Sequence, residues 1–167
     1  DDAELLARYL IEKGYPVESA EGMRIQSHPA VQLLVALMQQ HVQPDNEVVQ
    51  HIIRNLHAPF TQEQTTAINQ AFALPLYEAV QQLITLLQLS KQAGALPYLT
   101  AFQDQVYQFT QKRVSDLPAF LEYWEKKALK ATIPSSPVIN AIRILTIHSS
   151  KGLEFDIVML PFLNWDI

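Results

Sequence analysis

Apolar positions recur every three or four residues through most of the chain, which is the spacing of a helix with one buried face. The opening residues predict a first helix that Gly14 ends, followed by a short strand or coil from Val17. Residues 29–42 carry apolar side chains on most sides, so we expect a helix buried in a core. Ser27 is the predicted N-cap of that helix.

Four or five further amphipathic helices are predicted between Asp45 and about Lys130. Thr61 and Gln64 have the spacing of a capping box, and Asp116 is the predicted cap of the last helix. Breaks are expected at Pro44, Pro59, Pro75, Pro97 and Pro118. Short connections of this kind predict a compact helical bundle.

The period changes after TIPSSPV, residues 132–138, which is expected to be a linker. The next residues alternate as in a strand, with Ile142, Ile144, Thr146 and His148 on one face and Arg143, Leu145 and Ile147 on the other. DIVMLPF, residues 156–162, predicts a second strand buried on both faces. Because a short strand also follows the first helix, both ends of the chain are expected in one α/β sheet, with an all-helical insertion between them.

Composition narrows the classes of function. The chain has 167 residues, 49% hydrophobic and 17% charged, which is typical of a folded core. The run LLVALM, residues 33–38, is far too short for a membrane span, and the absence of cysteine excludes disulfides and fits a cytoplasmic protein. A net charge of −5 is unlike that of a free-standing nucleic-acid-binding domain. Any nucleic-acid role is therefore expected at a local site.

The loop between the two predicted strands has polar residues suited to a ligand site. Thr146 and His148 stand at the carboxyl end of a strand, where open α/β sheets bind ligands. Lys151 offers a point charge, Gly152 allows a tight turn, and Glu154 can accept a hydrogen bond from a ribose hydroxyl. From residue types and spacing alone, a functional site and a structured turn stay equally open.

The stretch from Thr146 to Phe155, TIHSSKGLEF, resembles motif V of superfamily 1A DNA helicases of the UvrD, Rep and PcrA group. The opening AELLARYLIEKGYPV is similar to the segment after motif IV of these enzymes. In that family a helical insertion, the 2B domain, interrupts the second RecA-like domain, 2A, between the two motifs. The resemblance implies a mainly α fold: residues 1–28 and 134–167 would form part of a RecA-like α/β domain, and residues 29–133 a 2B-like insertion.

The resemblance also implies roles for the residues of this loop. His148 would contact single-stranded DNA, and Thr146, beside it on the same strand end, would belong to the same DNA-binding site. Glu154 would reach the ribose of ATP, Gly152 would shape the nucleotide-binding loop, and Lys151 would support it. The loop would then couple the nucleotide state to the grip on DNA. No metal ligand is expected.

The insertion, with LYEAVQQLI and SDLPAFLEYWE, looks most like the AddA/RecB-like helicase–exonuclease branch. The resemblance implies a longer parent protein, an ATP-dependent DNA helicase that uses ATP and Mg²⁺ in double-strand-break repair in the bacterial cytoplasm, at the nucleoid. Its expected partners are single-stranded DNA, helicase domains 1A and 1B, the rest of 2A, and a nuclease domain or partner subunit. No membrane partner is expected.

The sequence carries no Walker A pattern and no evident Walker B carboxylate pair. Since phosphoryl transfer needs a phosphate cradle, Mg²⁺ ligands and a charge-stabilising arginine, we expect no catalytic residue in this chain and no ATP hydrolysis by it alone. The competing hypothesis is a non-catalytic helical protein-interaction module whose terminal strands merely resemble motif V.

Two other features favour ordinary structural roles. The basic cluster consists of Lys112, Arg113, Lys126, Lys127 and Lys130. Acidic residues interleave with it, which favours a solvated face over a contact with duplex DNA. Phe120 and Trp124 recur at helical spacing with leucines, which favours core packing over base stacking.

Overall fold

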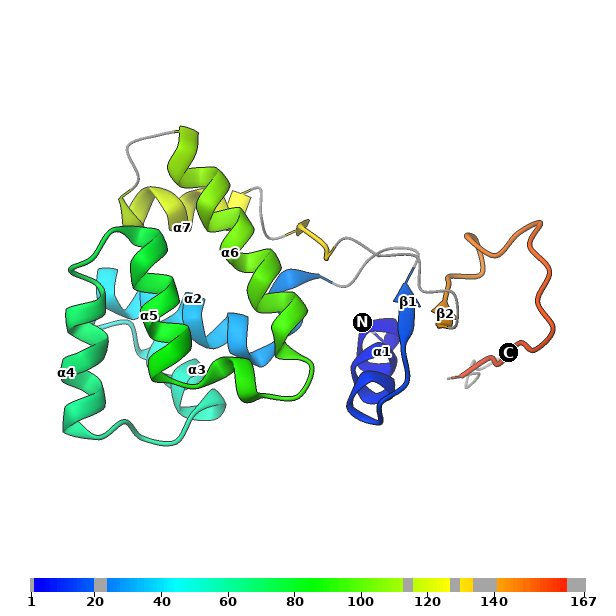
Figure 1. Ribbon diagram of the computed structural model, residues 1–167, viewed down its shortest axis with the longest axis horizontal. Coiled ribbons are helices and arrows are strands. Elements are labelled where there is room, and N and C mark those ends of the chain that lie inside the picture. The colour runs from blue at the N-terminus through cyan, green and yellow to red at the C-terminus, as the bar shows by residue number, and fades with distance from the viewer. Residues whose placement is uncertain (1, 20–23, 113–115, 127–129, 134–140, 162–167) are drawn as a thin grey trace.

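The computed structural model describes residues 2–19, 24–112, 116–126, 130–133 and 141–161. These ranges hold α1 (Asp2–Glu12), β1 (Val17–Ser19), the 3₁₀ turn η1 (Ile25–Ser27), α2 (Pro29–Val42), α3 (Glu47–Leu56), α4 (Gln62–Ala71), α5 (Leu76–Leu86), the 3₁₀ turn η2 (Leu89–Lys91), α6 (Ala95–Lys112), α7 (Leu117–Lys126) and β2 (Ile142–Ile144). Figure 1 shows α2 to α7 gathered in one helical body, with α1, β1 and β2 beside it. The prediction of a mainly α fold is confirmed.

Helix α2 lies at the centre of the helical body and contacts α3, α5, α6 and α7. Its buried side chains are Ala30, Val31, Leu33, Leu34, Ala36, Leu37 and Met38. Because these positions point to nearly every side of the helix, neighbours can pack around it on several faces. The prediction of a buried helix over residues 29–42 is confirmed. None of the described helices has the length and apolar character needed to cross a membrane.

The cap of α2 differs from the prediction. The backbone N–H of Ala30 donates to Nδ1 of His28 at 3.1 Å, whereas the Ser27 hydroxyl donates to a carbonyl of the preceding turn. The His28 ring is buried against Tyr98 of α6, with ring centroids 4.8 Å apart. Since Nδ1 accepts, Nε2 carries the proton and donates to the carbonyl of Ala93 at 3.3 Å. Packing against α6 therefore holds His28, and not Ser27, in the position that caps α2.

The other predicted caps are confirmed. The Gln64 N–H donates to the Thr61 hydroxyl at 3.2 Å, and the Thr61 N–H donates to the Gln64 side chain at 3.0 Å, which completes the capping box of α4. The Ala119 N–H donates to the Asp116 carboxylate at 2.7 Å at the start of α7. These caps satisfy backbone donors that have no partner within the helix.

The prolines follow the prediction only in part. Pro44 and Pro59 lie between helices and Pro75 is the N-cap of α5. Pro97 and Pro118 lie inside the first turns of α6 and α7. A first-turn proline removes an N–H that has no intrahelical acceptor, so it marks a helix start and not a break.

An aromatic cluster joins α6 to α7. The rings of Phe102 and Trp124 lie 4.9 Å apart and nearly perpendicular, and those of Phe109 and Phe120 lie 5.5 Å apart at 70°. Phe120 is 0% and Trp124 2% exposed. Edge-to-face packing of this kind adds to the free energy of area burial. The prediction that Phe120 and Trp124 are core residues is confirmed.

The two ends of the chain meet in a parallel sheet. Val17 pairs with Ile142, and Glu18 with Arg143. The Arg143 guanidinium also binds the Glu18 carboxylate, with Nε and Oε2 2.9 Å apart. The pairing confirms the prediction that both ends belong to one sheet.

The connections into and out of the helical body also lie together. The Ile25 N–H donates to the Ala131 carbonyl at 2.9 Å, and Arg24 forms an antiparallel bridge with Thr132. The chain therefore enters and leaves the helical body at one place, as an insertion requires. Residues 134–138 of the predicted linker lie outside the described residues, and the proposed domain boundaries stay a prediction.

Two predicted strands differ in the structure. The first ends at Ile144, and residues 147–152 form a turn, so Thr146 and His148 do not share a strand face. Residues 156–161 form no strand, and Ile157 to Leu160 are exposed. A strand exists only as a member of a ladder, and β1 offers β2 three partners. Strand propensity alone does not form a strand when no neighbouring strand is present to pair with.

A close contact joins α1 to the helical body. Gly94 precedes α6 with φ +70°, and a Cβ built there lies 3.2 Å from Cγ2 of Ile11. Gly14 ends α1 with φ +84°, as predicted, and a Cβ there meets nothing within 4 Å. The two glycines therefore share a backbone conformation and differ in the space around them.

We expect Gly14→Ala to lower the free energy of unfolding by about 1–2 kcal/mol through left-handed strain alone. Gly94→Ala shares this strain and also places its Cβ 3.2 Å from Cγ2 of Ile11, which must shift, so we expect a larger loss than for Gly14→Ala. In urea denaturation followed by ellipticity, Ile11→Ala combined with Gly94→Ala should lose less than the sum of the single changes. Additive losses would show that α1 does not rest on Gly94.

Candidate functional site

Four of the predicted site residues, Thr146, His148, Lys151 and Gly152, lie in a compact turn just after β2, which we call the polar turn (residues 146–152). Glu154 follows this turn. The Ser150 N–H donates to the Thr146 carbonyl at 3.0 Å, and the Leu153 N–H donates to the Ser150 carbonyl at 3.1 Å. The Lys151 N–H approaches the His148 carbonyl at 3.4 Å. These bonds coil the backbone where an extended strand was expected.

Hydroxyl groups hold the start of the polar turn. Oγ1 of Thr146 accepts from the Ser149 N–H at 3.2 Å and lies 2.8 Å from the Ser149 hydroxyl. The Ser150 hydroxyl donates to the Ile147 carbonyl at 3.0 Å. Neither serine was predicted to have a role. The signal was present, because adjacent Ser and Thr residues hydrogen-bond their own backbone and favour turns.

Gly152 ends the polar turn with φ +82°. A Cβ at this position would meet no atom within 4 Å, so the requirement for glycine comes from the backbone conformation and not from crowding. The predicted tight turn at Gly152 is confirmed. Its assignment to nucleotide binding stays a prediction.

The chemically active side chains point to solvent. His148, Lys151 and Glu154 are all exposed, and none forms an ion pair or side-chain hydrogen bond with another described residue. The turn places His148 and Lys151 on one coil of backbone, and Glu154 follows Gly152 by two positions. The arrangement offers an imidazole, an ammonium group and a carboxylate to external ligands.

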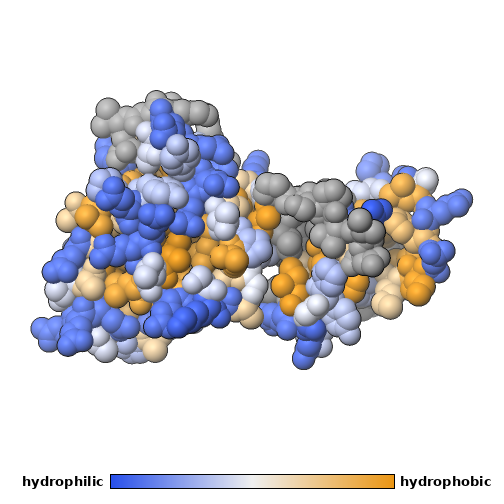
Figure 2. All heavy atoms as spheres, viewed as in Figure 1, coloured by the Kyte–Doolittle hydropathy of each residue, from blue (hydrophilic) through white to orange (hydrophobic). Residues whose placement is uncertain are grey.

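Apolar residues continue beyond the polar turn. Leu153, Phe155, Ile157, Val158, Met159 and Leu160 have exposed side chains. Hydrophobic surface is visible in Figure 2 at the end of the molecule where Figure 1 places the C-terminal segment. The polar turn thus stands between β2 and an exposed apolar segment.

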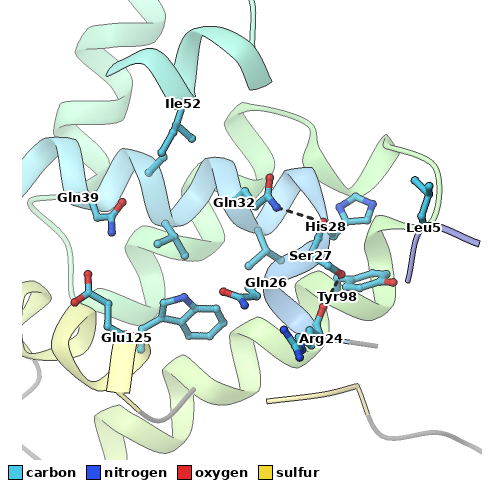
Figure 3. A pocket seen from close by; sticks show the side chains of 14 residues that line it. Leu5, Arg24, Gln26, Ser27, His28, Gln32, Gln39, Ile52, Tyr98 and Glu125 are labelled. Atoms are coloured by element: carbon cyan, nitrogen blue, oxygen red, sulfur yellow. Dashed lines mark hydrogen bonds between the residues drawn. The ribbon is translucent and has the colours of Figure 1, made fainter. Parts of the chain in front are cut away.

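A groove of about 660 Å³ lies on the helical body, away from the polar turn. Figure 3 shows Gln26, Gln32 and Gln39 around it, with Glu125 near one end and Leu5 near the other. None of the predicted site residues lines it. The groove is therefore a feature separate from the candidate site.

The basic cluster is partly neutralised. Lys126 is hydrogen-bonded to Glu122, and this bond, followed by the charge of Glu122, raises the pKa of Lys126 above its ordinary value. Lys130 is exposed, whereas Arg113 and Lys127 lie outside the described residues. For Lys126 the structure favours a solvated ion pair.

The described residues do not fit a complete Mg²⁺–ATP site. They contain no group of three or more His, Asp or Glu side chains able to hold a metal ion. Of the parts that ATP hydrolysis requires, the polar turn offers only the ammonium of Lys151, and the exposed carboxylate of Glu154 follows it.

Comparison with protein families matches residues 26–165 to the UvrD-like helicase C-terminal domain. The match spans the helical body, β2 and the polar turn. The chain belongs to the UvrD-like helicase C-terminal domain family. UvrD-like helicases are a family of ATP-dependent DNA helicases.

A curated relative is the probable DNA helicase II homolog of Mycoplasma capricolum subsp. capricolum, 28% identical over 85 residues. The alignment covers 48% of this chain and 12% of that protein. The chain thus corresponds to a small part of the relative's length. The search of solved structures found no match.

We expect Gly152→Ala to destabilise the polar turn by about 1–2 kcal/mol, because a Cβ disfavours the left-handed conformation. Gly152→Asn should cost less, since asparagine tolerates that region. Hydrogen exchange of the Leu153 amide, measured by NMR, reports the turn directly because this N–H binds the Ser150 carbonyl. Equal exchange in the wild type and both variants would contradict a conformational role for Gly152.

Proposed function

We propose that the chain forms part of the second motor domain of an ATP-dependent DNA helicase, and that its polar turn links the state of ATP to the grip on single-stranded DNA. The observation that carries this proposal is the polar turn itself. Within the family match, it exposes His148 and Lys151, and the exposed Glu154 follows two positions after Gly152.

The chemistry of the three side chains suits two different ligands. His148 and Lys151 can donate hydrogen bonds to a phosphate of the DNA backbone, and the Lys151 charge adds attraction. Glu154 can accept from a ribose hydroxyl of ATP. Because Gly152 lies between these groups, a ligand that reorders the turn at one end biases the other end. Each ligand then shifts the population of turn conformations that the other one meets.

The same proposal gives residues 1–28 and 134–167 to a partial RecA-like domain and residues 29–133 to a 2B-like insertion. The parallel pairing of β1 with β2 supports it, as do the adjacent connections at Ile25 and Ala131. Helicase domains 1A and 1B and the rest of 2A would supply the phosphate cradle and the Mg²⁺ ligands.

Within this family we propose the AddA/RecB-like helicase–exonuclease branch and a role in double-strand-break repair in the bacterial cytoplasm. The support is the character of the insertion, in LYEAVQQLI and SDLPAFLEYWE. A nuclease domain or a partner subunit would then complete the enzyme. The competing hypothesis is a non-catalytic helical interaction module, which predicts no effect of the polar turn on DNA.

The full-length protein that carries this chain tests the DNA contact. His148→Ala should weaken binding of single-stranded DNA about tenfold or more, the loss expected for a hydrogen bond to a charged group. Lys151→Ala should weaken binding. It should also reduce the slope of log K against log salt concentration by about 1, the change expected when one phosphate contact is lost. Fluorescence anisotropy at several salt concentrations measures both effects.

Lys91→Ala is the matched control, because Lys91 is equally exposed but lies on η2 of the helical body. It should leave both the affinity and the salt slope unchanged. If His148→Ala and Lys151→Ala also leave them unchanged, the polar turn does not bind DNA and the interaction module is favoured.

A second experiment concerns ATP. The purified 167-residue chain should release no phosphate from ATP above the background rate, with or without single-stranded DNA and Mg²⁺, because the phosphate cradle is not in its sequence. A coupled phosphate-release assay measures this, with the full-length protein as positive control. Phosphate release that grows in proportion to the concentration of the chain would contradict the proposal.

A further inference from the structure

Thr146 was predicted to belong to the DNA-binding site, but in the structure it forms several hydrogen bonds inside the polar turn. Its carbonyl accepts from the Ser150 N–H at 3.0 Å, and its hydroxyl accepts from the Ser149 N–H at 3.2 Å. The same hydroxyl lies 2.8 Å from the Ser149 hydroxyl. Thr146 therefore occupies the position of an N-cap residue, with Ser149 as the third residue of the coil.

The hydrogen-bonding positions of the Thr146 hydroxyl limit which contacts it can make with a ligand. A threonine hydroxyl has one donor and two acceptor positions. One acceptor position serves the Ser149 N–H, and the contact with the Ser149 hydroxyl uses a second position. A DNA phosphate needs a donor, and that donor is present only when Ser149 gives its own proton to Thr146. A direct contact with DNA is thus compatible with these bonds in only one of the two orientations of the hydroxyl pair, the one in which Ser149 donates.

The polar turn is short and exposed, so the hydrogen bonds of Thr146 affect the fraction of molecules in which this segment is folded into the turn. A single coil of backbone has few internal hydrogen bonds to offset the entropy of fixing its dihedral angles, and water competes for its donors. Removal of an N-cap side chain commonly shifts such an equilibrium about fivefold. Without the cap, this segment would be extended for more of the time. In an extended chain His148 and Lys151, three positions apart, point to opposite faces.

We infer that Thr146 is a positioning residue: it caps the polar turn so that His148 and Lys151 are presented together before a phosphate-bearing ligand arrives. Ordering the turn in advance reduces the entropy lost on binding. The identity of that ligand, single-stranded DNA, rests on the proposed function. The capping role itself rests only on the hydrogen bonds of Thr146.

Amide exchange in the 167-residue chain tests the capping role without DNA. Thr146→Val keeps the shape of the side chain and removes the hydroxyl, and it should speed exchange of the Ser149 amide about fivefold. Thr146→Ser keeps the hydroxyl and should leave the exchange rate within about twofold of the wild type. If Thr146→Val leaves the Ser149 amide unchanged, the inference is overturned whatever the protein does with DNA.

Binding of single-stranded DNA by the full-length protein tests positioning against direct contact. Thr146→Val should lower the affinity about fivefold when His148 and Lys151 are present, and should have little further effect when both are alanine, because it acts through them. Equal losses in both backgrounds would show that Thr146 touches DNA itself, and the positioning role would be overturned.

The two proposals fail in distinguishable ways. If Thr146→Val speeds exchange of the Ser149 amide while His148→Ala and Lys151→Ala leave DNA affinity intact, the proposed function fails. In that outcome the cap is real but does not position a DNA contact, so the inference about His148 and Lys151 is overturned as well. Support for both requires faster exchange together with a loss of affinity that is not additive.

Discussion

The rest of the structure depends on a parallel strand pair between segments far apart in the sequence. Glu18 and Arg143 are separated by 125 positions, yet they face one another across the ladder and form an ion pair. Parallel strands cannot be joined by a tight turn, so any connection between them must cross over outside the sheet. Here the helical body is that crossover. The bridge between Arg24 and Thr132 brings its two connections together, which lets a whole body be inserted without separating the strands.

The length of this ladder also decides where the candidate site forms. The described ladder pairs three residues of β1 with three of β2, and β2 ends at Ile144. Backbone donors beyond that point need other acceptors. Thr146 supplies two of them, its carbonyl and its hydroxyl, and the chain coils into the polar turn. The exposed positions of His148 and Lys151 are therefore a consequence of where the strand pairing stops.

The helical body is held together by more uniform forces. Apolar side chains around α2 and edge-to-face rings between α6 and α7 bury a continuous core, and hydrophobic burial of this kind is not directional. Directional contacts also lie where the body meets the terminal segments. His28 caps α2 while its ring packs on α6, and Gly94 lets Ile11 of α1 approach closely. These contacts set how the terminal helix rests on the body that interrupts the sheet.

The sequence by itself determined the helices, the caps at Thr61 and Asp116, and the turns at Gly14 and Gly152, because each depends on neighbours a few positions away. Only the tertiary structure decided that His28 caps α2, since its ring is held by a carbonyl 65 positions away. It also decided that the strand ends at Ile144 and that residues 156–161 form none, because strand propensity becomes a strand only beside a partner. Local hydrogen bonds can be predicted from adjacent residues, whereas strand pairing and contacts between helices depend on which distant segment of the chain packs beside them.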